Sequence, residues 1–205
     1  MITIIDYEMG NLNSIQNMFT YIGVESKIES DLDKIKNASK ILLPGVGSFD
    51  TAMKNINESD LKEVLNEKAL KEQVPVLGIC LGMQLLTNSS EEGGLVGLGW
   101  IDAKTISFKD RIDKKYRVPH MGWNIVNKSK ESLLTQGFDE LDEAKFYFVH
   151  SYFVKVEDEE NSILKSNHGV EFDCAIQKDN IYGAQFHPEK SHKFGMKLFE
   201  NFAKI

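Results

Sequence analysis

Cysteine, proline and long apolar runs are scarce in this chain of 205 residues, which has two cysteines and four prolines. Cys80 and Cys174 are too few and too far apart for a disulfide framework, so the sequence favours a reducing compartment. No apolar run approaches the roughly 18 residues that a membrane-spanning helix requires. The N-terminal segment MITIIDY lacks the basic residues of a signal peptide. These absences predict a cytoplasmic protein with no membrane partner.

Positive charge is also in deficit, because 24 Lys and Arg residues face 31 Asp and Glu residues, for a formal net charge of -7 at pH 7. Binding to nucleic acid requires clustered Lys and Arg side chains, so the composition argues against a nucleic-acid partner. Hydrophobic residues make up 41% of the chain, a proportion typical of folded soluble proteins rather than disordered ones. The length fits one domain that spans residues 1–205.

Through residue 90, short apolar runs alternate with amphipathic segments. The runs that predict β-strands are residues 1–5, 24–28, 41–43 and 76–79. Apolar residues on one helical face predict a helix from Leu12 to Ile22, which Gly23 ends. Asp60 and Glu63 form the pattern of a capping pair at the start of another helix. Strands that alternate with helices imply right-handed crossovers and a parallel sheet.

Beyond residue 90 the pattern changes. Residues 91–127 are rich in glycine and predict irregular structure, with one strand around residues 101–108. Closely spaced β-like segments follow at residues 146–149, 152–156, 163–166, 171–177 and 181–186. A final amphipathic helix is predicted from about Ser191. Together the two halves predict an α/β fold with a mixed sheet.

The stretch from Val74 to Gln84, VPVLGICLGMQ, has the pattern of a nucleophile elbow. A predicted strand meets Cys80, which lies between Gly78 and Gly82 and precedes a helix-like run. Glycine at both flanking positions avoids Cβ atoms that would crowd a strained turn. The thiol would also lie at a helix N-terminus, whose unpaired N–H groups attract negative charge. The alternative is a buried core cysteine, and the paired glycines favour the nucleophile.

A cysteine nucleophile requires a base. The five histidines of the chain are His120, His150, His168, His187 and His192. We predict that His168, in a turn, and His192, at a helix start, are solvated. His187 follows the last predicted strand, at an edge where open α/β sheets present their active groups. Glu189 lies two residues on and can orient the imidazole, so Cys80, His187 and Glu189 fit the logic of a catalytic triad.

A further candidate is the loop Pro44-Gly45-Val46-Gly47, which follows the predicted strand at residues 41–43. Its two glycines allow backbone N–H groups to face a ligand, as an oxyanion hole requires. The alternative of a phosphate loop is disfavoured, because the segment has no lysine and the chain has no G-x-x-x-x-G-K-[ST] string. No histidine or cysteine pair has the spacing of metal ligands, so no metal site is predicted.

Five motifs occur in order and span nearly the whole chain: PGVGSF, GICLGMQ, HMGWN, FVHSY and QFHPEKS. With them the sequence strongly resembles the class I (triad-type) glutamine amidotransferases, and within these the glutaminase subunits of imidazole glycerol phosphate synthases. The resemblance implies a flavodoxin-like three-layer α/β fold, whose mixed, mostly parallel central sheet is flanked by helices. It also implies an enzyme that hydrolyses glutamine to glutamate and ammonia without a cofactor.

The resemblance implies that Cys80 is the nucleophile that forms a γ-glutamyl thioester. His187 would protonate the departing ammonia and then deprotonate water, and Glu189 would orient His187. The positions matched to the oxyanion hole are Leu81 and the segment Gly45, Val46 and Gly47. The positions matched to glutamine binding are Gln84, Glu92, Ser151 and Tyr152. Asn11 matches a position that steadies the PGVG loop, and His150 is by the family pattern not the base.

The family's glutaminase works as a heterodimer with a (β/α)8-barrel cyclase, which receives the ammonia. The pair makes imidazole glycerol phosphate and AICAR in histidine biosynthesis. The positions matched to the interface are Met121, Trp123, Tyr147 and Lys190. From the residues alone, Trp123 reads equally well as a core aromatic. Activity in such pairs depends on the synthase ligand, which we expect to act by reorienting the loop Pro44–Gly47.

Small departures from the family pattern leave the acceptor enzyme open. Thr87-Asn88, the segment GLGWIDAK and the charged loop from Lys109 to Lys115 look less typical of the histidine-pathway enzyme. Paralogous glutaminases supply ammonia to a sugar amidotransferase in surface-polysaccharide biosynthesis, with the same thiol chemistry. A catalytically silent binding subunit is a further alternative, and the complete triad argues against it.

Overall fold

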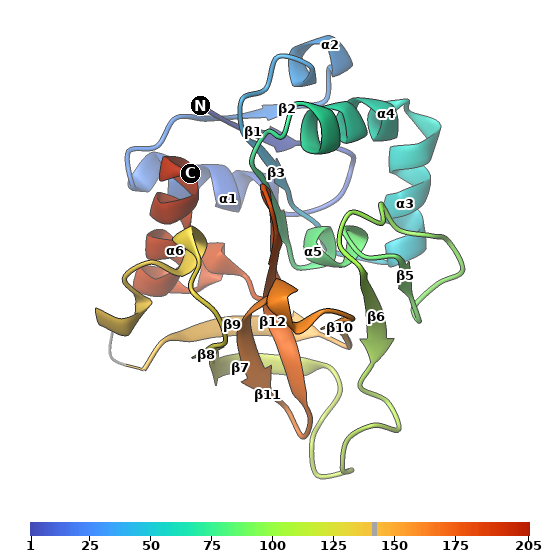
Figure 1. The fold of residues 1–205 in the computed structure, drawn as a ribbon, viewed down its shortest axis with the longest axis vertical. Helices are drawn as coiled ribbons and strands as arrows, with labels where there is room; N and C mark the ends of the chain where they lie inside the picture. The colour runs from blue at the N-terminus through green and yellow to red at the C-terminus, as the bar shows by residue number, and fades with distance from the viewer. Residues whose placement is uncertain (141–142) are drawn as a thin grey trace.

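The computed structural model describes residues 1–140 and 143–205, which form a large mixed sheet, a two-stranded sheet and flanking helices (Figure 1). The strands of the large sheet are β1 (Ile2–Ile5), β2 (Ser26–Glu29), β3 (Ile41–Leu43), β4 (Val76–Ile79), β5 (Ser89–Ser90), β6 (Ala103–Ser107), β8 (Asn127–Lys128), β10 (Tyr152–Val156), β11 (Ser162–Asn167), β12 (Glu171–Lys178) and β13 (Ile181–Ala184). The small sheet pairs β7 (His120–Ile125) with β9 (Lys145–His150). The helices are α1 (Leu12–Tyr21), α2 (Leu32–Ile35), α3 (Phe49–Glu58), α4 (Leu61–Asn66), α5 (Leu81–Leu85) and α6 (His192–Lys204), with helical turns η1 (Glu67–Lys71), η2 (Leu133–Thr135), η3 (Phe138–Glu140), η4 (Glu159–Asn161) and η5 (Pro188–Lys190). Within the described ranges, a helix with the length and apolar character of a membrane span is absent.

The strand order of the large sheet is β2-β1-β3-β4-β13-β12-β10-β6-β5, with β11 paired to β12 and β8 to β11. From β2 to β13 the neighbouring strands are parallel, as the alternation of strands and helices predicts. Strands β10, β11 and β13 pair with β12 in the antiparallel sense. The predicted mixed and mostly parallel central sheet, flanked by helices, is confirmed.

Helices cover both faces of the parallel strands, with α1 and α6 on one side and α3, α4 and α5 on the other (Figure 1). Successive residues of a strand face opposite sides of the sheet. Ile4 packs in a buried cluster with Phe19 of α1 and Phe199 of α6, whereas Ile5 packs with Phe49 of α3. Because both faces are buried, the central strands appear in the sequence as continuous apolar runs.

The capping pair predicted at the start of α4 is wrong. Asp60 has a φ of 53° and makes no side-chain hydrogen bond to the helix. An N-cap residue normally has extended backbone, which aims its side chain at the first free N–H groups. Only Ser59 and Asp60 separate α3 from α4, so the chain reverses through the left-handed region and that geometry is lost.

A strand was also missed in the segment predicted to be irregular, residues 91–127. His120–Ile125 forms β7, which pairs antiparallel with β9 and sets Trp123 opposite Tyr147. Its alternation is inverted, because Met121 and Trp123 are exposed whereas the polar side chain of His120 is buried. A pattern in which the apolar face is the outer one does not predict a half-buried strand.

Candidate active site

Cys80 lies at a strained turn between β4 and α5, as the elbow pattern predicts. Its φ is 54° and its ψ is -109°, a conformation that non-glycine residues rarely adopt. A Cβ added at Gly78 would lie 2.5 Å from the carbonyl oxygen of Gly82, and one added at Gly82 would lie 1.9 Å from that of Leu43. The two glycines therefore allow α5 to start directly against the ends of β3 and β4.

His187 and Glu189 reach the same edge of the sheet because β13 runs parallel to β4, with Ala184 opposite Ile79. The Nδ1 of His187 lies 2.8 Å from Oε1 of Glu189, and the two side chains are only 5% and 2% exposed. Burial alone would lower the pKa of His187, but the interactions with Cys80 and with the Glu189 carboxylate outweigh it and raise the pKa to about 10. His187 is thus held as a cation at neutral pH and can donate a proton.

Glu189→Gln is expected to lower the pKa of His187, so that the imidazole loses its proton at lower pH. The pKa of His187 in the folded chain, about 10, lies above its ordinary value of 6.5, so the protonated imidazole also stabilises the fold. This stabilisation is complete below pH 6.5 and is lost as the pH rises through about 10. NMR titration of the His187 ring measures the shift directly, with the exposed Glu25→Gln variant as the control. An unchanged His187 titration in Glu189→Gln would contradict the pairing.

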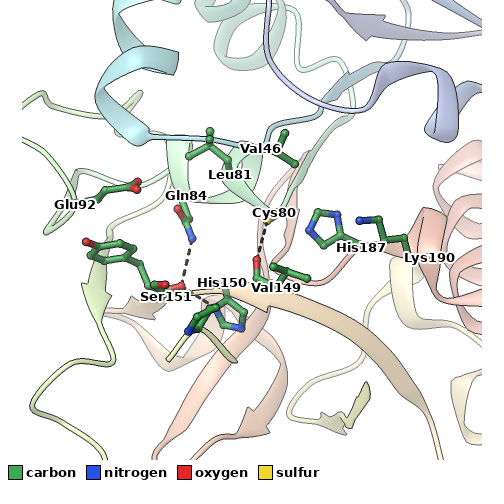
Figure 2. Close-up of a pocket in the computed structure, with 13 residues that line it drawn as sticks. Val46, Cys80, Leu81, Gln84, Glu92, Val149, His150, Ser151, His187 and Lys190 are labelled. Carbon is green, nitrogen blue, oxygen red and sulfur yellow. Dashed lines mark hydrogen bonds between the residues drawn. The ribbon is translucent and has the colours of Figure 1, made fainter. Parts of the chain in front are cut away.

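A cavity of about 360 Å³ opens beside these groups. Its lining residues are Val46, Gly47, Cys80, Leu81, Gln84, Glu92, Pro119, Val149, His150, Ser151, Tyr152, His187 and Lys190. Figure 2 shows Glu92 and Lys190 toward opposite ends of the cavity, with Cys80 between them. The cavity therefore presents an anionic group on one side of the thiol and a cationic group on the other, and its volume suits a small polar molecule.

The four residues that the motifs match to glutamine binding, Gln84, Glu92, Ser151 and Tyr152, all line this cavity. The amide nitrogen of Gln84 donates to the carbonyl oxygen of Tyr152 at 3.3 Å, which ties α5 to the start of β10. The Glu92 carboxylate accepts the backbone N–H of Phe49 at 2.9 Å, at the start of α3. Segments far apart in the sequence are thus fixed around one thiol.

The loop Pro44–Gly47 lies against Cys80, but it presents a carbonyl group there. The N–H of Leu81 donates to the carbonyl oxygen of Gly45 at 3.4 Å, so one donor matched to the oxyanion hole already has a partner. The buried Tyr7 hydroxyl donates to the carbonyl oxygen of Pro44, and burial raises the pKa of Tyr7. A Cβ on Gly45 would lie 2.8 Å from the Tyr7 hydroxyl. Tyr7 was not expected from the sequence, and it holds the loop in this orientation.

Asn11, matched to the support of this loop, is exposed and precedes α1 without capping it through its side chain. The closer neighbour is Gly10, where an added Cβ would lie 3.2 Å from Cβ of Pro44. Gly10 has a φ of 104°, which allows this close approach. In this structure the backbone before α1 supports the loop, and a role for Asn11 stays a prediction.

The residues matched to a partner interface gather on the outer face of the small sheet and on η5. Met121 is 62% and Trp123 is 44% exposed, so the reading of Trp123 as a core aromatic is wrong. The rings of Trp123 and Tyr147 are 6.2 Å apart, and Nζ of Lys190 lies 6.0 Å from the Tyr147 ring centre. His192 is exposed, as predicted, and stacks on Trp123. Because Lys190 also lines the cavity, this surface adjoins the thiol.

Two further groups were not expected near the site. Gln185 is fully buried, and its amide nitrogen donates to Sγ of Cys80 at 3.8 Å. The position of Gln185 follows from the register of the sheet. The parallel pairing of β13 with β4 sets Ala184 opposite Ile79, so the next residues, Gln185 and Cys80, lie side by side. His168 was predicted to be solvated, but it is half-buried and stacks on His120 at 4.2 Å, so that prediction is wrong. Among residues 1–140 and 143–205, no three His, Cys, Asp or Glu side chains group as a metal site would require.

Comparison with known proteins gives consistent matches along the chain. The family model described as glutamine amidotransferase class-I matches residues 3–205. Imidazole glycerol phosphate synthase subunit HisH 2 of Methanococcus maripaludis is 54% identical over 204 residues, covering 100% of this chain and 99% of that relative. Imidazole glycerol phosphate synthase subunit HisH 2 of Pseudomonas aeruginosa is 45% identical over 205 residues, covering 100% of this chain and 100% of that relative.

Solved structures share the fold at low sequence identity. PurLQS from Thermotoga maritima matches with a TM-score of 0.74 and 16% identity, covering 99% of this chain and 97% of that chain. The glutaminase domain of Trypanosoma brucei CTPS matches with a TM-score of 0.68 and 14% identity, covering 99% and 93%. These similarities extend over nearly all strands and helices of the chain.

Proposed function

This chain belongs to the class-I glutamine amidotransferase family, and we propose that it is the glutaminase subunit of an imidazole glycerol phosphate synthase in histidine biosynthesis. It hydrolyses glutamine to glutamate and ammonia and passes the ammonia to a cyclase subunit. The observation that carries this proposal is the position of Cys80, on a glycine-flanked strained turn beside the buried pair of His187 and Glu189. A structural cysteine needs neither that turn nor that pair.

In the proposed reaction, Sγ of Cys80 attacks the carboxamide carbon of glutamine and forms a tetrahedral adduct. His187, protonated at neutral pH, donates its proton to the nitrogen as the C–N bond breaks, which releases ammonia and leaves a γ-glutamyl thioester. The neutral His187 then takes a proton from water, whose oxygen attacks the thioester carbon. Collapse of this second adduct breaks the C–S bond, releases glutamate and restores the thiolate–imidazolium pair. Glu189 accepts the Nδ1–H of His187 throughout and stabilises its cationic form.

The charges of the cavity support one orientation for glutamine. The Glu92 carboxylate is suited to the α-ammonium group of the substrate, and Cys80 lies between it and Lys190 (Figure 2). Gln84, Ser151 and Tyr152 line the same cavity. The side-chain carboxamide would then reach Sγ, while the amino-acid end stays near Glu92.

An oxyanion hole requires the loop Pro44–Gly47 to change orientation. In the present arrangement the Gly45 carbonyl accepts the hydrogen bond of the Leu81 N–H, which is then not available to an oxyanion. The oxygen end of the carbonyl dipole would also repel the negative charge of a tetrahedral adduct. Rotation of the peptide group between Gly45 and Val46 would remove this carbonyl and turn the N–H of Val46 toward the thiol. We infer that binding of the cyclase and its ligand favours the rotated loop.

The isolated chain is therefore expected to hydrolyse glutamine slowly, and the cyclase with its ligand is expected to raise the rate by about 10²–10³-fold, the usual worth of one oxyanion donor. The measurement is glutamate release by this chain alone, with the cyclase, and with the cyclase plus ligand. Full activity of the chain alone would contradict the loop mechanism.

We propose as the partner surface the outer face of the small sheet, which contains the exposed Met121 and Trp123 and the half-buried Tyr147, with Lys190 at its edge. Exposed aromatic and methionine side chains are enriched at protein interfaces. We propose that a (β/α)8-barrel cyclase covers this face and receives ammonia from the adjoining cavity. Mass spectrometry of proteins that co-purify with the chain tests the partner: a cyclase supports the proposal, whereas a sugar amidotransferase places the same glutaminase in surface-polysaccharide synthesis.

A further inference from the structure

A row of buried polar groups connects the inner face of β7 to the glutamine-binding segment. The amide nitrogen of Asn124 lies 3.1 Å from Nε2 of His120. Nδ1 of His120 lies 2.9 Å from Nε2 of His150, and Nδ1 of His150 lies 2.7 Å from the carbonyl oxygen of Tyr152. His120 and His150 are 4% and 6% exposed. These contacts have no part in the proposed reaction, yet they end at a residue that lines the cavity.

From the Tyr152 carbonyl the row continues to the nucleophile. The same oxygen accepts the amide N–H of Gln84 at 3.3 Å, and Gln84 also donates to Oε1 of Gln185 at 3.1 Å. Gln185 in turn donates to Sγ of Cys80 at 3.8 Å. Figure 2 shows His150, Gln84 and Cys80 around the cavity. We call this row the polar relay: Asn124, His120, His150, the Tyr152 carbonyl, Gln84 and Gln185.

The direction of the hydrogen bonds is fixed from the Asn124 end. The oxygen Oδ1 of Asn124 accepts the backbone N–H of Ile125 at 2.9 Å, and its nitrogen donates to the carbonyl oxygen of Asn167 at 2.8 Å. The amide orientation is thus set without reference to His120. Because the Asn124 nitrogen only donates, Nε2 of His120 must accept, and its proton must be on Nδ1.

The direction is fixed independently from the other end. The Tyr152 carbonyl only accepts, so Nδ1 of His150 carries the proton that it donates. Nε2 of a neutral His150 is then an acceptor, which matches a donating Nδ1–H on His120. Both ends require the same arrangement, in which each histidine is the Nδ1–H tautomer.

Both histidines stay neutral near pH 7. Burial lowers the pKa of His120 to about 4, and the charge of His168 acts in the same direction. Burial lowers the pKa of His150 to about 3. The charges of His120, His168 and His187 lower this pKa further, whereas the hydrogen bond to the Tyr152 carbonyl raises it. The other groups packed around them are the rings of Phe108, Phe148 and Phe172. The relay therefore keeps one direction through the neutral range.

We propose that His120 and His150 are positioning residues for glutamine binding: their hydrogen bonds hold the Tyr152 carbonyl, which in turn holds Gln84 and Gln185 beside Cys80. The positioning role rests on the proposed function, because that function names glutamine as the substrate. The tautomers of His120 and His150 follow from the hydrogen bonds alone and do not rest on it. The opposite face of β7 carries Met121 and Trp123, so the strand that a partner would touch is hydrogen-bonded to the substrate cavity through its inner face.

The tautomers are tested first, by NMR of the ring nitrogens in the intact chain. Free neutral histidine prefers the Nε2–H form, so Nδ1–H forms of His120 and His150 identify the relay. His168 serves as an internal control, because its Nε2 faces the carbonyl oxygen of Arg117 at 2.8 Å and must carry a proton. An Nε2–H tautomer at His150 would overturn the proposal whether or not the chain hydrolyses glutamine.

The positioning role is tested in the presence of the cyclase with a diazoketone analogue of glutamine, which alkylates Cys80 and separates binding from reaction. His120→Phe keeps a ring in the aromatic cluster but removes the bond to His150, and should raise the half-saturating concentration about tenfold, the loss of roughly one hydrogen bond. The maximal alkylation rate should change less than about twofold, because the triad is untouched. His120→Asn retains an N–H near the Nδ1 position and should restore most of the binding.

His168→Phe is the matched control, since it keeps the ring that stacks on His120 but removes no relay bond. Its half-saturating concentration should equal that of the unmodified chain. Equal weakening in His120→Phe and His120→Asn, or no weakening in either, would overturn the positioning role. Failure of the unmodified chain to react at Cys80 in the presence of the cyclase would instead overturn the proposed function, and the tautomer result would stand apart from it.

Discussion

Cys80→Ala is expected to abolish glutamine-dependent synthesis by the complex and to leave synthesis from added ammonium salts intact. The variant removes the sulfur atom that we propose forms the thioester, and residual hydrolysis should fall by at least about 10⁴-fold, as for other lost nucleophiles. The acceptor reaction keeps its own active site and needs only ammonia. The measurement compares product formation from glutamine with that from ammonium, at the same concentration of complex.

Cys174→Ala provides the control for a general effect of losing a thiol. Cys174 is fully buried in β12, and burial raises the pKa of its thiol well above the ordinary value, so it does not react as a thiolate. Glutamine-dependent synthesis should persist in this variant. Equal loss in both variants, or loss of the ammonium-dependent reaction in Cys80→Ala, would contradict the role assigned to Cys80.

Gly82→Ala is expected to destabilise the fold by about 3 kcal/mol or more, because the added methyl group overlaps backbone atoms that cannot move independently. The new Cβ would lie 1.9 Å from the carbonyl oxygen of Leu43 in β3. Relief requires α5 to move away from the sheet, and this movement shifts Cys80 away from His187. Thermal or denaturant unfolding measures the loss of stability, and alkylation by the diazoketone analogue measures the loss of reactivity.

Gly94→Ala is the matched control, since a Cβ at this exposed glycine meets no atom within 4 Å. Its free energy of unfolding should stay within about 0.5 kcal/mol of the unmodified chain. If Gly82→Ala unfolded like Gly94→Ala and retained full reactivity, the strained-turn explanation of the elbow would be wrong.

The sequence predicts the elements whose pattern reflects burial. The apolar runs of β1, β3 and β4 mark strands covered on both faces, and the ends of β3 and β4 carry the PGVG loop and Cys80. β7 escapes prediction because its apolar side chains, Met121 and Trp123, face outward. Asp60 shows the converse limit: its residue type fits a cap, but the tight reversal between α3 and α4 imposes a backbone that excludes one.

In the candidate site too, some residues are predicted from local sequence patterns and others depend on how distant segments pack. Cys80, His187 and Glu189 are predicted because the residue type and the pattern of the surrounding segment are enough to identify each of them as a candidate. Gln185 is not predicted, because its place beside Cys80 depends on the register between β13 and β4. The orientation of the Gly45 carbonyl depends on a single peptide rotation and on the Tyr7 hydroxyl, which no local pattern encodes.

The most direct test of the glutaminase site is reaction of the chain with the diazoketone analogue of glutamine, in the presence of the cyclase, followed by peptide mass mapping. The triad geometry predicts one adduct per chain, on Cys80, and protection by glutamine. An adduct on Cys174, or none at all, would contradict the assignment of Cys80 as the nucleophile.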